Sequence, residues 1–185
     1  MIGNDIVDLK QAAKDSNWKR PRFLDKVFTV EEQQLIADAK NQHQMVWLLW
    51  SMKEAAYKVN VQQFGKRFFN PKRLECEFVS LEKGQVVIDF ETYFTSSEIS
   101  KDYVYTVAVL NPKQSYKSEW FRDKKLEISK QSDHLQNRFL KALNLDLTTI
   151  IKNNVGVPKL YCNTKVLNTS FSLTHHGAFS GYTML

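Results

Sequence analysis

A chain of 185 residues with 43% hydrophobic and 25% charged residues is long enough for one domain with its own core, and this composition excludes extended disorder. No stretch approaches the ~18 apolar residues of a membrane span, and the acidic start MIGNDIVDLK does not resemble a signal peptide, so we expect a soluble, cytoplasmic protein without a membrane partner. The formal charge of +6 favours an anionic partner, and the candidates are nucleic acid, a phosphorylated metabolite and an acidic protein. The cysteines, Cys76 and Cys162, lack zinc-site spacing and predict ordinary thiols.

The first part of the chain predicts a strand followed by two helices. Residues 2–9, IGNDIVDL, are rich in β-branched residues and predict a short buried strand, which Asp5 interrupts. Thr29 and Glu32 have the spacing of a capping box and predict a helix start in FLDKVFTVEEQQLIADA. Residues 45–64 give the clearest helical pattern of the chain, and a helix this apolar must be largely buried.

The remainder of the chain predicts antiparallel strands and one further helix. Within residues 72–110, LECEFVSL, GQVVIDFETYF and DYVYTVAVL alternate with period two and predict three strands. Residues 111–133 are polar and predict a surface excursion or a partner-facing flap. A helix is expected over residues 134–153, and VLNTSFSLT and FSGYTML predict two strands around a His-His-Gly turn. The pattern predicts one α+β domain over residues 1–185, with a long buried helix packed on antiparallel strands.

Two acids occupy positions where burial is expected. Glu54 lies in the middle of the apolar helix, where a buried carboxylate requires a compensating charge. A simpler explanation is an exposed ion pair with Lys58, four residues along. Asp5 lies in an apolar strand, where Asp is disfavoured. If strand and helix pack together, the two carboxylates form a plausible Mg²⁺ site, because Mg²⁺ accepts one or two protein carboxylates and completes its shell with water and phosphates. Asp8 points to the opposite face from Asp5, which favours a structural role or one at the start of the next helix.

Several short motifs, in order, carry a family resemblance. GNDIVDL at residues 3–9 is similar to a G-x-D-I motif, and WSMKEAAYK at residues 50–58 is similar to W/F-x-x-K-E-A-x-x-K. FLDKVFTVEE resembles a linking segment before a capped helix, and GVPKL followed by SFSLTHHG resembles G-x-P and S-x-S-H elements. In this order the motifs resemble the 4'-phosphopantetheinyl transferase superfamily, in its single-module holo-acyl-carrier-protein synthase arrangement. The chain is longer than a minimal single module, and Trp50 is more like the two-module class. Val7 stands where many two-module members have a further acidic ligand.

The resemblance implies a Mg²⁺-dependent transferase. Its 4'-phosphopantetheine donor would be coenzyme A, its acceptor a serine of an acyl or peptidyl carrier protein, and its second product 3',5'-ADP. The carrier would serve fatty acid biosynthesis, or polyketide or peptide synthesis. By resemblance Asp5 and Glu54 would hold the metal, and Glu54, or a water that it and the metal orient, would be the general base. Lys58, on the same helical face as Glu54, would contact a phosphate and act with Glu54 in catalysis. Lys53 faces elsewhere and would be structural or face coenzyme A at the rim of the site.

The resemblance also implies a coenzyme A site. His175 would bind a phosphate beside Ser172 and Thr174, whereas His176 has no implied role. Arg20 and Arg22, in WKRPRF, match the 3'-phosphate or an acidic carrier, because guanidinium groups pair with phosphate and carboxylate. A solvated basic loop is the alternative. The resemblance leaves open whether the protein is a monomer or a homo-oligomer with its site between subunits.

Two other functions remain open at this stage. The basic charge and the aromatic residues of GKRFFNPKR fit a non-enzymatic nucleic-acid-binding module. Ordinary core packing explains the same aromatic residues, so nucleic acid ranks well behind. A degenerate family member that binds coenzyme A or a carrier without turnover is the third reading.

Overall fold

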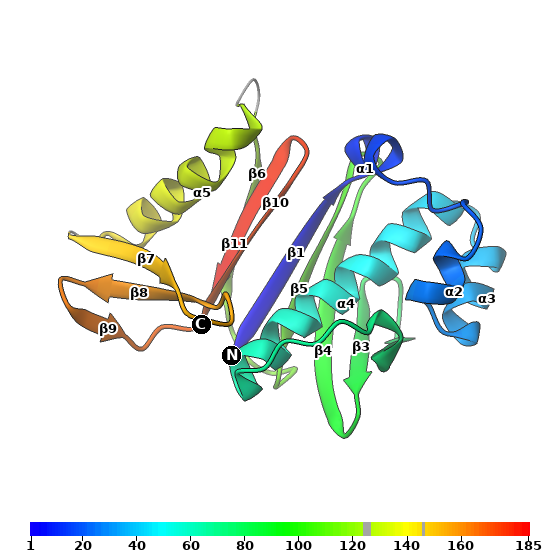
Figure 1. The fold of residues 1–185 in the computed structure, drawn as a ribbon, viewed down its shortest axis with the longest axis horizontal. Helices are drawn as coiled ribbons and strands as arrows, with labels where there is room; N and C mark the ends of the chain where they lie inside the picture. The colour runs from blue at the N-terminus through cyan, green and yellow to red at the C-terminus, as the bar shows by residue number, and fades with distance from the viewer. Residues whose placement is uncertain (124–126, 146) are drawn as a thin grey trace.

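The computed structural model describes residues 1–123, 127–145 and 147–185, and Figure 1 shows two groups of elements that meet along β1. On one side, a five-stranded sheet has the order β1-β5-β4-β3-β2 and is covered by the long helix α4. On the other side, a three-stranded sheet has the order β10-β11-β6 and packs against helix α5. A third sheet, β7-β8-β9, lies beside α5. All the strand pairs that the structure describes are antiparallel.

The elements of the first group belong to the first part of the chain. Its strands are β1 (Ile2–Asp8), β2 (Leu74–Phe78), β3 (Lys83–Ile88), β4 (Glu91–Ile99) and β5 (Tyr103–Val109). Its helices are α1 (Leu9–Asp15), α2 (Phe23–Val27), α3 (Val30–Asp38) and α4 (Gln42–Phe64), with a 3₁₀ turn η1 (Pro71–Arg73) before β2. The elements of the second group are β6 (Lys117–Arg122), α5 (Ile128–Leu143), β7 (Thr148–Lys152), β8 (Pro158–Cys162), β9 (Lys165–Leu167), β10 (Phe171–His176) and β11 (Phe179–Met184).

Helix α4 has the features that its sequence predicts. The Asn41 side chain accepts a hydrogen bond from Gln44 N at the start, and Gly65 ends the helix with a left-handed φ of 64°. Its apolar residues pack against the five-stranded sheet, and β1 is among its closest neighbours. Gly3 permits this approach, because a Cβ added there would lie 2.1 Å from Ala55 O. The expected α+β architecture of a long buried helix on antiparallel strands is confirmed.

The two groups are joined by side chains of β10 that bind the free edge of β1. Three alternate backbone N–H groups of β1, from Asn4 to Asp8, donate to β10 side chains, where a neighbouring strand would offer carbonyl groups. The three bonds run from Asn4 N to Ser172 Oγ at 3.2 Å, from Ile6 N to Thr174 Oγ1 at 3.1 Å and from Asp8 N to His176 Nδ1 at 3.0 Å. Because both the strand and the acceptors repeat with period two, these bonds fix the register of β10 against β1.

Two expected elements are corrected. The helix expected over residues 134–153 is wrong in extent: α5 ends at Leu143, Asn144 adopts a left-handed φ of 51°, and the β-branched residues that follow form β7. GQVVIDFETYF forms two strands, not one, because the chain turns at Asp89, whose φ is 55°. Both errors arise where a residue with positive φ interrupts an otherwise continuous pattern.

The polar stretch at residues 111–133 contributes β6 and the start of α5 to the second group. Lys117–Arg122 forms β6, which pairs with β11, and Phe121 is buried against α5 and its sheet. Residues 124–126 lie outside the described residues. None of the described helices is long and apolar enough to cross a membrane. The cytoplasmic location stays a prediction.

Lys53, next to Glu54 in α4, forms a buried ion pair with the capping residue of α3. Its Nζ lies 2.8 Å from Glu32 Oε2, and the two side chains are 3% and 1% exposed. Lys53 also donates to Pro71 O at 2.9 Å and to Leu74 O. Glu32 completes the expected capping box with Thr29, which is confirmed. Lys53 therefore connects α4, α3 and the segment leading into β2.

We expect Lys53→Met to lower the free energy of unfolding by about 3–5 kcal/mol, because it leaves the Glu32 carboxylate buried without its cation. Urea denaturation at pH 7 measures the change. The double variant Lys53→Met/Glu32→Gln, which removes both charges, should recover much of the loss. A decrease below about 1 kcal/mol in the single variant would contradict the structural role of Lys53.

Candidate active site

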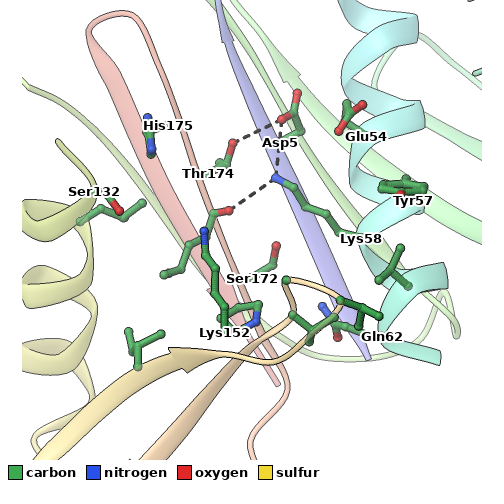
Figure 2. Close-up of a pocket in the computed structure, with 18 of the residues that line it drawn as sticks. Asp5, Glu54, Tyr57, Lys58, Gln62, Ser132, Lys152, Ser172, Thr174 and His175 are labelled. Atoms are coloured by element: carbon green, nitrogen blue, oxygen red, sulfur yellow. Dashed lines mark hydrogen bonds and ion pairs between the residues drawn. The ribbon is translucent and has the colours of Figure 1, made fainter. Parts of the chain in front are cut away.

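Asp5 and Glu54 come from different elements and line the same cavity. Asp5 projects from β1 and Glu54 from α4, and Figure 2 shows the two side chains next to one another. The cavity has a volume of about 740 Å³ and lies between α4 and β1 on one side and β10, α5 and the β7–β8 hairpin on the other. The convergence expected from the sequence is therefore present in the fold.

Burial disfavours the ionised forms of both acids, and the Asp5 charge adds to this effect at Glu54. Burial raises the pKa of Asp5, and the Lys58 ammonium group opposes this effect. Burial and then the Asp5 charge raise the pKa of Glu54 to about 7, again opposed by Lys58. Among the described residues, Lys58 is the cation that acts on both carboxylates, whereas His176 acts on Asp5 alone, so a further positive charge at this place would be favoured.

The two oxygens of Asp5 have different surroundings. Oδ1 accepts a hydrogen bond from Thr174 Oγ1 at 3.3 Å and lies 3.7 Å from Lys58 Nζ (Figure 2). Oδ2 is buried and has no hydrogen-bond partner among the described residues. A buried carboxylate oxygen without a donor is destabilising unless a ligand satisfies it.

The donor set fits Mg²⁺ in its hydrated form. The described residues contain no group of three or more His, Cys, Asp or Glu side chains that would enclose a metal. Two carboxylates, one with a free buried oxygen, match the usual Mg²⁺ site, in which water and substrate phosphates complete the octahedron. Zn²⁺ fits poorly, because it requires more nitrogen or sulfur donors from the protein.

Lys58 connects the two halves of the site instead of pairing with Glu54. Its Nζ donates to Asn4 O at 2.6 Å on β1 and to Leu173 O at 3.4 Å on β10. The structure describes both Lys58 and Glu54 and records no ion pair between them, so the simpler explanation of an exposed helical pair is wrong. The ammonium group faces the cavity between β1 and β10, close to Asp5.

The rest of the cavity wall is cationic on an apolar background. Ser172, Thr174 and His175, expected from SLTHHG, all line it, and partial burial followed by the Lys58 charge lowers the pKa of His175. Sequence reasoning missed Arg67 and Lys152, which supply two further positive charges. Arg67 lay within GKRFFNPKR, considered for nucleic acid, and Lys152 lay within the incorrectly extended helix.

The structure does not bring Arg20 and Arg22 to this cavity. Both side chains are exposed before α2, where they line a separate groove together with Lys26 and the 95% exposed Phe69. The arginines are therefore not positioned beside the two acids. An interaction of this loop with phosphate or with a carrier stays a prediction.

Asp8 and His176 have structural roles. Asp8 caps α1 by accepting from Lys10 N and Gln11 N, which confirms the expected role at the start of that helix. Its other oxygen accepts from Ala178 N at 2.9 Å in the turn after β10. His176 Nδ1 accepts from Asp8 N, so its ring belongs to the junction between β1 and β10.

The fold places a strand acid and a helix acid beside a cationic cavity, and comparison with known proteins gives the family. The model of the 4'-phosphopantetheinyl transferase superfamily matches residues 1–108. The chain belongs to this superfamily, whose members transfer phosphopantetheine. Among solved structures, the holo-[acyl-carrier-protein] synthase AcpS of Thermotoga maritima is similar, with a TM-score of 0.46 and 13% identity over 89% of this chain and 83% of that chain. No curated protein matches the chain.

We expect the metal-free protein to lose stability as the pH rises from about 4.5 to about 7, the ordinary and the raised pKa of Glu54. In this window the folded state binds more protons than the unfolded state, so the free energy of unfolding falls with rising pH, by at most about 3 kcal/mol for Glu54. Urea denaturation in EDTA at pH 4.5 and pH 8 measures the change.

Glu54→Gln should remove the Glu54 part of this decrease, and Glu75→Gln, which changes an exposed acid on β2, should retain it. An unchanged decrease in Glu54→Gln would show that Glu54 ionises normally in the folded protein.

Proposed function

We propose that the protein transfers 4'-phosphopantetheine from coenzyme A to a serine of an acyl or peptidyl carrier protein and releases 3',5'-ADP. The observation that carries the proposal is the convergence of Asp5 and Glu54 in one cavity, with Asp5 Oδ2 buried and unpaired among the described residues. Membership of the superfamily supports phosphopantetheine transfer in general. Its holo-acyl-carrier-protein synthase type, and a place in fatty acid biosynthesis, belong to the proposal.

Asp5 and Glu54 would hold Mg²⁺, which when bound supplies positive charge for the oxygens of the coenzyme A pyrophosphate. Lys58 faces the same space, fixed by two backbone carbonyls, and its remaining proton is available to a phosphate oxygen. This arrangement suits phosphoryl transfer, which depends mainly on positioning and on neutralising charge at the oxygens.

Glu54 is the proposed base for the serine hydroxyl. Its raised pKa of about 7 in the absence of metal places its carboxylate near the range of a useful base at neutral pH. A neighbouring divalent cation lowers the pKa of a carboxylate. The alternative base is therefore a water that Glu54 orients, and either form requires the Glu54 carboxylate.

The cavity walls support coenzyme A as the donor. Lys58, Arg67 and Lys152 place three cations around a cavity of about 740 Å³, and apolar residues from β7 and β8 form the opposite wall. His175 with a lowered pKa is neutral at pH 7 and offers a ring N–H to a phosphate oxygen. Ser172 accepts from Asn4 N, so its own hydroxyl proton remains available to the same phosphate.

A single chain supplies both walls of the proposed site. β1 and α4 contribute Asp5, Glu54 and Lys58, and β10 and the β7–β8 hairpin contribute His175 and Lys152. We therefore propose that the functional unit is a monomer and not a homo-oligomer with its site between subunits. Measurement of solution mass under assay conditions tests this part of the proposal.

A transfer assay tests the function directly. Incubation with coenzyme A, Mg²⁺ and an apo carrier protein should add phosphopantetheine to the carrier, which intact mass spectrometry detects. Asp5→Asn and Glu54→Gln should each lower kcat/KM by about 100-fold or more, because the metal interaction is worth several kcal/mol in the transition state.

Glu75→Gln is the matched control for these variants. Full transfer by Glu54→Gln would contradict the metal-site role even if the activity is correct. Absence of an adduct across fatty-acid, polyketide and peptide carriers would favour the degenerate member that binds without turnover.

The basic groove before α2 supports contact with an acidic carrier. Arg20→Glu/Arg22→Glu should raise KM for the carrier about 10-fold or more and leave the affinity for coenzyme A unchanged, because these arginines lie outside the cavity. Steady-state kinetics with each substrate varied separately measures both values. Lys83→Glu, which reverses one exposed charge at the start of β3, is the control. A change confined to coenzyme A would instead favour the 3'-phosphate assignment.

A further inference from the structure

We propose that Thr174 is a positioning residue that holds the Asp5 carboxylate so that its Oδ2 atom faces the bound cation. This inference rests on the proposed function, because it concerns the same metal site. The threonine hydroxyl contacts the ligand side chain and not the reacting atoms. It lies in β10, whereas Asp5 lies in β1, so the contact reaches across the junction of the two groups of elements.

The direction of the Thr174 hydrogen bonds follows from the donor on β1. Ile6 N is only a donor, and it donates to Thr174 Oγ1 at 3.1 Å. The hydroxyl has one proton of its own, and it donates this proton to Asp5 Oδ1 at 3.3 Å. Thr174 is 6% exposed, so water has little access to either bond. The backbone N–H of Ile6 thus orients the Thr174 hydroxyl, and the hydroxyl in turn orients the side chain of Asp5.

This contact selects which Asp5 oxygen remains for a ligand. Thr174 and Lys58 are both on the Oδ1 side, at 3.3 Å and 3.7 Å, whereas Oδ2 is buried without a partner among the described residues. Loss of the Thr174 hydroxyl would leave Lys58 beside Oδ1 and Ser51 as the other hydroxyl that acts on the carboxyl group, and the carboxylate could then rotate toward the Lys58 ammonium group. Lys58 and the cation would then compete for the two oxygens of Asp5, and this competition would weaken cation binding.

The direction of these hydrogen bonds also argues against Thr174 as a phosphate contact, the role that SLTHHG suggested for it. Its only proton is directed at Asp5, so the hydroxyl has none left for a phosphate oxygen. The two assignments predict different losses. A positioning role predicts weaker cation binding with unchanged affinity for coenzyme A, and a phosphate contact predicts the reverse.

His176 provides a matched comparison within the same strand. Its side chain also accepts a hydrogen bond from β1, at Asp8 N, but the Asp8 carboxylate is used in capping α1 and in binding Ala178 N. Loss of the His176 side chain therefore removes one bond of the junction and leaves the Thr174–Asp5 contact in place. A general weakening of the junction would affect both positions, whereas positioning of Asp5 concerns Thr174 alone.

The experiment measures Mn²⁺ binding to protein without coenzyme A, by electron paramagnetic resonance at pH 8. Thr174→Val, which keeps the shape and removes the hydroxyl, should raise the Kd for Mn²⁺ about 10- to 100-fold, the usual effect of losing a partner of a metal ligand. Thr174→Ser, which keeps the hydroxyl, should stay within about 3-fold of the unchanged protein. His176→Ala should also stay within about 3-fold.

Circular dichroism establishes that each variant is folded, and Thr174→Ala is the second hydroxyl-free variant if Thr174→Val does not fold. In the transfer assay, Thr174→Val should require more Mg²⁺ for half-maximal rate with an unchanged KM for coenzyme A. Unchanged Mn²⁺ affinity in the hydroxyl-free variants, or a loss of coenzyme A affinity alone, would overturn the proposal. Equal losses in His176→Ala would also overturn it.

Failure of this inference is distinguishable from failure of the proposed function. If Asp5→Asn and Glu54→Gln lose Mn²⁺ binding while Thr174→Val keeps it, the metal site stands and only the positioning role is wrong. If Asp5→Asn and Glu54→Gln bind Mn²⁺ as the unchanged protein does, the metal site itself is wrong, and both proposals fall together.

Discussion

The junction between β1 and β10 is the constraint on which the candidate site depends. β1 is the edge strand of the five-stranded sheet, and its free N–H groups bind side chains of β10 instead of another strand's carbonyl groups. On its other face, Gly3 lets α4 approach the same strand closely, because any Cβ would collide with the helix backbone. Asp5 is therefore fixed from two directions, by the helix that carries Glu54 and by the strand that carries Thr174 and His175. A shift of either neighbour would separate the groups that the site requires.

The electrostatics of the site explain why so much of the structure is directed at one carboxylate. A buried pair of acids opposes folding when both are ionised, and here burial raises the pKa of both. Lys58 offsets only part of this effect, since its position is set by Asn4 O and Leu173 O and not by the acids alone. Lys53 shows the contrast within the same helix, because it is paired with Glu32 and surrounded by backbone acceptors. Lys53 neutralises Glu32 inside the fold. Lys58 leaves part of the negative charge of Asp5 and Glu54 unbalanced, and a bound cation would balance it.

The sequence allowed prediction of those features that conflict with their local surroundings. Asp5 in an apolar strand and Glu54 in an apolar helix were identifiable because burial of an unpaired carboxylate is unfavourable, and the capping pair Thr29 and Glu32 was identifiable from spacing alone. The bonds from β1 to β10 were not predictable, since they connect residues 168 positions apart and leave no periodic signal. Lys152 was missed for a different reason: the left-handed Asn144 ends α5 before the chain turns into β7, and a helical pattern does not reveal such a stop.

The division of the chain between the two walls of the cavity explains why the first part resembles a known family more clearly. The family match ends at residue 108, after Asp5, Glu54 and Lys58 and before β10 and the β7–β8 hairpin. Two carboxylates that share one cation must be placed within a fraction of an ångström, which restricts the strand and helix that hold them. The opposite wall has a less exacting requirement, because positive charge and apolar surface can be supplied from many positions on a hairpin. Thr174 differs from the rest of that wall, since its hydroxyl donates directly to one oxygen of Asp5.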